Sequence, residues 1–147
     1  MKKKILSLLL VAGLSVSMFA GCGSGTADAN KAAKGGKEAA SDLKIGAILI
    51  GDETETYSKA HIDGIKEAAK ELGIPENNIE WKERIDESED CYDAAKALVA
   101  DGCTLVISNS YGHQDYIAEA AEEFTDVNFV SMTGDYAAIS GLDNYYN

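Results

Sequence analysis

Residues 44–50 have the sequence KIGAILI, and this short apolar run decides the fold. A β-rich run without polar alternation is typical of a strand that is buried on both faces of a sheet. Two later runs, TLVIS at 104–108 and NFVSM at 128–132, have the same character. Residues 79–85 also predict a strand, but their polar side chains place it nearer a sheet edge.

Segments with helical spacing of apolar residues separate these predicted strands. They lie within residues 62–72, 91–99 and 117–124. Gly73 follows the first of them as a stop, and Ser88 precedes the second as an N-cap. The predicted order is β-α-β-α-β-α-β, which indicates an α/β fold with a doubly wound parallel sheet.

In such sheets, ligands bind beyond the carboxyl ends of the strands. We therefore expect the loops at 51–57, 109–113 and 133–136 to line a site. The sequence contains no GxGxxG, GxxxxGK, CxxC, HExxH or GxSxG motif. Since these motifs carry the common phosphate-binding, metal and hydrolase chemistries, we expect no enzyme, no cofactor and no metal site.

The charge of the chain limits its partners. Its 147 residues include 13 Lys and Arg against 25 Asp and Glu, which gives a net charge of -12. Nucleic-acid binding needs a basic patch that neutralises phosphates, so a nucleic-acid partner is disfavoured. Lys2, Lys3 and Lys4 form a basic cluster at the start of the chain.

An apolar run from Ile5 to Phe19 follows that cluster, and Ala20-Gly21-Cys22 follows the run. This pattern predicts a secretory signal peptide at 1–21. Ala-Gly-Cys resembles a bacterial lipobox, although Phe19 stands where Leu is usual. The resemblance implies a lipid anchor at Cys22 and a place on the extracytoplasmic face of the cell membrane. Residues 22–42 contain no large apolar side chain and predict a flexible, lipid-anchored linker.

Three blocks of the remaining chain resemble the basic membrane protein family. They are KIGAILIGDETETYSKAHIDGIKEAAKELGI, CYDAAKALVADGCTLVISNSYGHQDYIAEAAEEFTDVNF and GLDNYYN. The family comprises substrate-binding lipoproteins of ABC transporters and includes purine nucleoside receptor-like proteins. The resemblance implies that residues 43–147 are part of the N-terminal lobe of a type I periplasmic-binding-protein fold, cut short at its end. It also implies a small nucleoside-like ligand, held between two lobes and delivered to ABC permease subunits.

The resemblance assigns a ligand-stacking role to Tyr57, while Asp52 in the same loop is a candidate for hydrogen bonds to a ribose or base. Nucleoside-binding relatives often have a Gly-x-Gly-aromatic run where this chain has Ser108-Asn109-Ser110-Tyr111, so a purine nucleoside is not assured as the ligand. His113 is either a ligand contact or an exposed residue at a helix start. The candidate ligand-binding residues are Asp52, Tyr57, Asn109, Ser110, Tyr111 and His113.

Two alternatives accompany this interpretation. One is a ligand-sensing lipoprotein of the same fold that signals to a membrane receptor, and the other is a flavodoxin-like enzyme domain. Cys91 and Cys103 open a predicted helix and a predicted strand, at points expected to lie far apart. A disulfide needs Cα atoms within about 7 Å, so both are predicted to be small core residues.

Overall fold

The computed structural model describes residues 42–147. The predicted signal peptide, the lipidation site at Cys22 and the linker up to residue 41 lie outside the described residues. Within the described part, no helix combines the length and apolar character that crossing a membrane requires.

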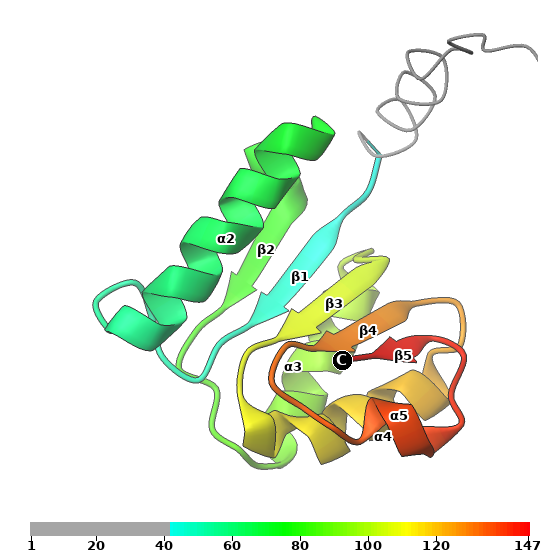
Figure 1. The fold of residues 1–147 in the computed structure, drawn as a ribbon. Coiled ribbons are helices and arrows are strands. Elements are labelled where there is room, and N and C mark those ends of the chain that lie inside the picture. Colours follow the sequence, from blue (N-terminus) through cyan, green and yellow to red (C-terminus); the bar gives the residue numbers. More distant parts are fainter. Residues whose placement is uncertain (1–41) are drawn as a thin grey trace, which may run out of the picture.

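Five parallel strands form one sheet, in the order β2-β1-β3-β4-β5 (Figure 1). Their register places Ile48 opposite both Lys82 and Ser108, and Ser108 opposite Ser131. The carboxyl ends of four strands are therefore level with one another, and the predicted parallel α/β sheet is confirmed. The strands are β1 (Ile45–Ile48), β2 (Ile79–Lys82), β3 (Leu105–Ser108), β4 (Asn128–Ser131) and β5 (Tyr145–Tyr146).

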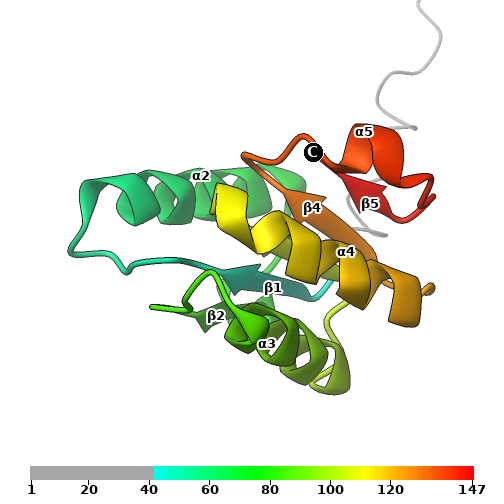
Figure 2. The same cartoon turned by 90° about the horizontal axis from the view of Figure 1, so that it is seen from below.

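Helices cover both faces of the sheet, as expected for right-handed crossovers that run in two directions from β1. Helix α2 (Thr56–Leu72) lies on one face, while α3 (Glu89–Ala100) and α4 (Gln114–Glu123) lie on the other (Figure 2). The short helical segments are η1 (Glu76–Asn78), η2 (Tyr111–His113) and α5 (Ala137–Ser140).

The predicted helix boundaries have clear physical causes. The hydroxyl of Ser88 accepts a hydrogen bond from the Asp90 amide and caps α3. Gly73 ends α2 in the left-handed conformation, with a φ of 77°. At the start of α2 the N-cap is Glu55, whose carboxylate accepts from the amides of Tyr57 and Ser58.

The core has one layer on each side of the sheet. Leu98, Ile117 and Phe129 are fully buried on the side of α3 and α4. Ile65 and Ala69 of α2 pack on the other side, against strand residues such as Ile45. Cys91 and Cys103 are buried free thiols, as the sequence predicted, and burial raises the pKa of Cys91 to about 12.

The predicted second strand, 79–85, is too long. β2 ends at Lys82, and Arg84 adopts a φ of 57°. The Arg84 amide still donates to the Gly51 carbonyl at 3.1 Å, but a left-handed residue cannot continue the extended ladder. The turn brings the Arg84 side chain beside the loop that follows β1.

The expected element order is also incomplete, because α5 and β5 follow β4. Strand β5 is only two residues long and has no apolar run to indicate it. Long-range bonds hold it in place: the Phe129 amide donates to the Asn144 carbonyl at 2.8 Å. The Asn144 side chain in turn donates to three carbonyls at the end of α4 and in the following loop, those of Ala121, Phe124 and Val127.

Candidate functional site

The carboxyl edge of the sheet comprises the loops that follow β1 to β4, residues 49–55, 83–88, 109–113 and 132–136. The arrowheads of these four strands point in the same direction in Figure 1, toward these loops. Three of the loops were predicted to line a site, and the structure brings them together. The fourth, 83–88, was not predicted to take part.

The backbone carbonyl of Asn109 is the point where three of these segments meet. It accepts a hydrogen bond from the hydroxyl of Tyr57, at the start of α2. It also accepts one from the hydroxyl of Thr133, in the loop after β4, at 3.0 Å. These hydrogen bonds connect the segments that follow β1, β3 and β4.

Two predicted aromatic residues present their rings to solvent at this edge. Tyr57 is 42% exposed and Tyr111 is 55% exposed. The Tyr57 hydroxyl donates a hydrogen bond to the Asn109 carbonyl. The Tyr111 hydroxyl donates one to the Asp135 carboxylate at 3.1 Å. Fixed, exposed aromatic rings are suited to stacking on a planar ligand.

The side chain of Asn109 has a different place from the one expected. It is fully buried, its Oδ1 accepts from the Ile50 amide at 3.0 Å, and its Nδ2 donates to the Ser58 hydroxyl at 3.2 Å. These bonds join the end of β3 to the loop after β1 and to the start of α2. Asn109 therefore positions the loops, and its amide group is engaged within the protein.

Asp52 is also engaged within the protein. It is 6% exposed, accepts from the amide of Thr54 at 2.8 Å and from its hydroxyl, and forms an ion pair with Arg84. The hydrogen bonds from Thr54 and Arg84 lower the pKa of Asp52 to about 2. The sequence did not single out Arg84, although it is the one arginine in the chain.

Ser110 is buried, and its hydroxyl donates a hydrogen bond to Glu87. Glu87 also accepts from the Gly112 amide at 3.0 Å. These two bonds lower the pKa of the Glu87 carboxyl below its ordinary value. These partners lie 23 and 25 residues further along the chain, so no local sequence pattern indicates this role of Glu87.

His113 is fully buried, so it is not the exposed helix-start residue that one interpretation expected. Its Nε2 lies 3.0 Å from the Ile85 carbonyl, which can only accept, so Nε2 carries a proton and donates this hydrogen bond. Its buried Nδ1 has no hydrogen-bond partner within the described structure. Burial lowers the pKa of the imidazole and favours the neutral form.

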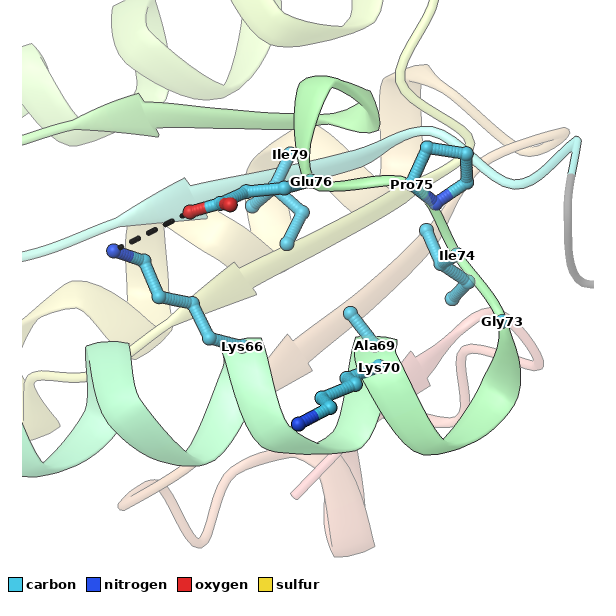
Figure 3. A pocket seen from close by; sticks show the side chains of 8 residues that line it. All are labelled: Lys66, Ala69, Lys70, Gly73, Ile74, Pro75, Glu76 and Ile79. Carbon is cyan, nitrogen blue, oxygen red and sulfur yellow. Dashed lines mark ion pairs between the residues drawn. The ribbon is translucent and has the colours of Figure 1, made fainter.

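A separate pocket of about 450 Å³ lies between the end of α2 and the start of β2 (Figure 3). The side chains of Lys66 and Glu76 point toward each other across it and form an ion pair, with 3.7 Å between Lys66 Nζ and Glu76 Oε1. It is at the amino end of β2, away from the carboxyl edge, and contains none of the predicted site residues. Among residues 42–147, no cluster of three or more His, Cys, Asp or Glu side chains could hold a metal ion.

No protein-family model and no curated protein matches this chain. Solved structures do match it in fold. One is a transcriptional activator of the comK gene from Bacillus halodurans, with a TM-score of 0.53 and 20% identity over 63% of this chain and 30% of that one. Another is a LacI-family transcription regulation repressor from Corynebacterium glutamicum, with a TM-score of 0.55 and 17% identity over 70% of this chain and 43% of that one.

A third similar structure is an ABC transporter system solute-binding protein from Conexibacter woesei. Its TM-score is 0.51, and the match is 20% identical over 60% of this chain and 28% of that one. The chain thus matches less than half the length of each of these three proteins. At these identities the likeness concerns the fold: residues 42–147 form an α/β domain with a five-stranded parallel sheet that resembles one lobe of a periplasmic-binding-protein fold.

Proposed function

We propose that this chain supplies one wall of a ligand-binding cleft in an exported solute-binding lipoprotein of an ABC importer, with a nucleoside-like ligand. The observation that carries the proposal is the pair of exposed tyrosine rings, Tyr57 and Tyr111, fixed at the carboxyl edge of a periplasmic-binding-protein-like lobe. A polar-aromatic ligand would stack on these rings, and each stack is worth about 1–3 kcal/mol.

The other predicted site residues take supporting roles in this proposal. Asn109, Ser110 and His113 are buried, and their hydrogen bonds position the loops. Asp52 forms an ion pair with Arg84. The ligand would meet the rings and the exposed polar atoms around them. In a two-lobed protein, a second wall would close over the ligand, and binding would shift an open–closed equilibrium without any covalent step.

Membership of the basic membrane protein family, lipid attachment at Cys22 and delivery to permease subunits belong to the same proposal. The solute-binding protein of similar fold supports a transport role. The two regulators of similar fold make ligand sensing the second candidate function. The net charge of -12 argues against direct DNA binding by this chain.

The test is a ligand titration followed by NMR, with adenosine as the first probe and a sugar and an amino acid as comparison probes. We expect adenosine to shift resonances of Tyr57 and Tyr111, with weak affinity because one wall buries only part of the ligand. Tyr57→Leu and Tyr111→Leu should each weaken binding about tenfold or more, as the loss of one stack implies.

Tyr92→Leu is the matched control, because Tyr92 lies on α3, where its hydroxyl bonds to Glu123 of α4. Its substitution should leave adenosine binding unchanged. If adenosine shifts no resonance at the carboxyl edge while the sugar or the amino acid does, the nucleoside-like ligand is wrong. If Y92L loses as much adenosine affinity as Y57L does, the loss does not come from stacking on the Tyr57 ring, and the stacking proposal is wrong.

A further inference from the structure

His113 is a fully buried histidine with one unused ring nitrogen. Its Nε2 donates to the Ile85 carbonyl at 3.0 Å, while its Nδ1 has no hydrogen-bond partner in the part of the chain that the structure describes. Native proteins pair nearly all of their buried polar atoms, so an unpaired one calls for an explanation. None of the bonds that position the candidate site uses this Nδ1.

The hydrogen bond to Ile85 joins the loop after β2 to η2. Two further hydrogen bonds connect the same two segments, from the Ser110 hydroxyl and from the Gly112 amide to the Glu87 carboxylate. The buried His113 ring is therefore part of the contact that holds η2 against the loop.

Of these two segments, the loop is the one fixed to the sheet. The Ile85 amide donates to the Leu49 carbonyl at 3.0 Å, directly after β1. The segment η2 begins with Tyr111, whose ring is exposed and whose hydroxyl bonds to Asp135. A change at His113 would therefore move η2, and with it the Tyr111 ring.

Protonation of His113 would place a second N–H group and a positive charge in this buried position. The Nδ1–H would lack an acceptor, and the charge would lie at the start of α4, where the helix dipole disfavours a cation. Burial accordingly lowers the pKa of the imidazole. A protonated ring is stable only where it reaches water, and this requires η2 to separate from the loop.

Few charges face the imidazole from the elements packed against it. In the loop after β2, the Glu87 carboxylate raises the pKa of the ring, though by less than burial lowers it, and Asp86 acts on the ring through its backbone. The Cys91 thiol of α3 and the Tyr145 hydroxyl of β5 stay neutral, because burial raises the pKa of both. Asp115, in the first turn of α4, is exposed. Among the described residues, Glu87 thus supplies the charge that acts on the ring.

We propose that His113 is a positioning residue that couples the stacking surface to pH: when the ring takes up a proton, η2 separates from the loop after β2 and the Tyr111 ring is displaced. The inference rests on the proposed function of the same edge and adds its regulation. The ligand binds while the ring is neutral and is released as the pH falls.

The experiment follows the full chain by NMR between pH 8 and 5, first without a ligand and then with adenosine as the probe. Without a ligand, the imidazole resonances of His113 should titrate together with the amides of Ile85, Tyr111 and Gly112. Because proton and ligand exclude each other, each pH unit below the measured pKa of His113 should weaken adenosine binding about tenfold.

Three variants separate the groups that could cause this pH dependence. His113→Gln keeps a donor for the Ile85 carbonyl but cannot titrate, so its adenosine affinity should stay constant over this range. His61→Gln removes the other histidine of the chain, whose ring centroid lies 4.7 Å from that of Tyr57, and should keep the pH dependence. Glu87→Gln keeps an acceptor but removes the charge that favours the protonated ring, so the decrease in affinity should begin at a lower pH.

A constant adenosine affinity between pH 8 and 5 would overturn the inference, and so would a pH dependence that persists in H113Q or disappears in H61Q. Titration of His113 without shifts of the η2 amides would also contradict it, as would a ring that stays neutral down to pH 5. If adenosine binds at no pH, the proposed nucleoside function fails, while the titration without a ligand still decides whether His113 positions η2.

Discussion

Asn109 is the residue on which the geometry of the carboxyl edge depends most. Its buried side chain forms hydrogen bonds with the Ile50 amide and the Ser58 hydroxyl. Its carbonyl accepts hydrogen bonds from the hydroxyls of Tyr57 and Thr133. Asn109→Ala would leave the Ile50 amide without its acceptor. We expect a loss of about 1–3 kcal/mol in the free energy of unfolding, measured by urea denaturation.

Asn128→Ala is the matched control for that measurement, because Asn128 is exposed at the start of β4. Its unfolding free energy should stay within about 0.5 kcal/mol of the unaltered value. Equal stability of N109A and N128A would show that the Asn109 side chain does not hold the loops together.

His113 should make stability depend on pH. Burial lowers the pKa of its imidazole in the folded chain, so the unfolded chain takes up the proton first as the pH falls. Its contribution is complete above the ordinary pKa of 6.5 and decreases as the pH falls below that value. Urea unfolding between pH 8 and 5 should therefore show stability falling toward pH 5.

The decrease should shrink in His113→Gln, whose amide can still donate to the Ile85 carbonyl, and should persist in His61→Gln on the partly exposed face of α2. Glu55 and Glu87 have lowered pKa values, so their ionisation changes little in this range. An unchanged pH profile in H113Q would assign the dependence to other groups.

Elements with a long pattern were predictable, and elements without one were not. The runs at 44–50 and 104–108 predicted β1 and β3 because burial on both faces requires continuous apolar sequence. The caps at Ser88 and Gly73 were predictable because they act within one turn of the chain. Strand β5 was missed because the Asn144 bonds that hold it come from residues 17 to 23 positions away.

The close packing of β1 against α3 gives a second stability prediction. A side-chain carbon on Gly46 would lie 2.7 Å from Leu98 Cδ1 and 3.0 Å from Leu98 Cβ, and Leu98 is fully buried. Gly46→Ala should therefore push α3 from the sheet and destabilise the fold by about 1–3 kcal/mol. Thermal and urea unfolding both measure this loss.

Gly64 provides the opposite case within α2, since a side-chain carbon there meets no atom within 4 Å. Gly64→Ala should stabilise the fold by about 0.5–1 kcal/mol, because alanine loses less backbone freedom in a helix interior. Destabilisation by G64A as large as that by G46A would contradict the packing explanation.

The candidate site was predictable as a place but not as a set of contacts. Parallel strands bring the loops after β1, β3 and β4 to one edge, and the sequence alone located that edge. Which side chains face solvent depends on bonds between loops, such as those of Asn109 and Glu87, that no local pattern encodes. The sequence therefore brought Tyr57, at the start of α2, and Tyr111, in η2, to this edge, while the engagement of Asn109 and Asp52 within the protein emerged only from the fold.

Cys22 carries the prediction about where the protein resides. It lies outside the described residues, and its lipidation rests on the signal-peptide pattern at 1–21 and the Ala-Gly-Cys sequence. Palmitate supplied to a bacterium that expresses the full chain should label it and retain it in the membrane fraction, since two or more acyl chains anchor a protein stably. Cys22→Ser should abolish the label.

Cys91→Ala is the control, because that thiol is buried in the core and burial raises its pKa to about 12, which leaves it protonated and unreactive. This variant should keep both the label and the membrane location. A label that survives in C22S would show that the lipid is attached to another residue. If the unaltered chain is exported without a label, the predicted signal peptide remains supported and the lipid anchor at Cys22 is wrong. The net charge of -12 would then disfavour binding to an anionic membrane surface.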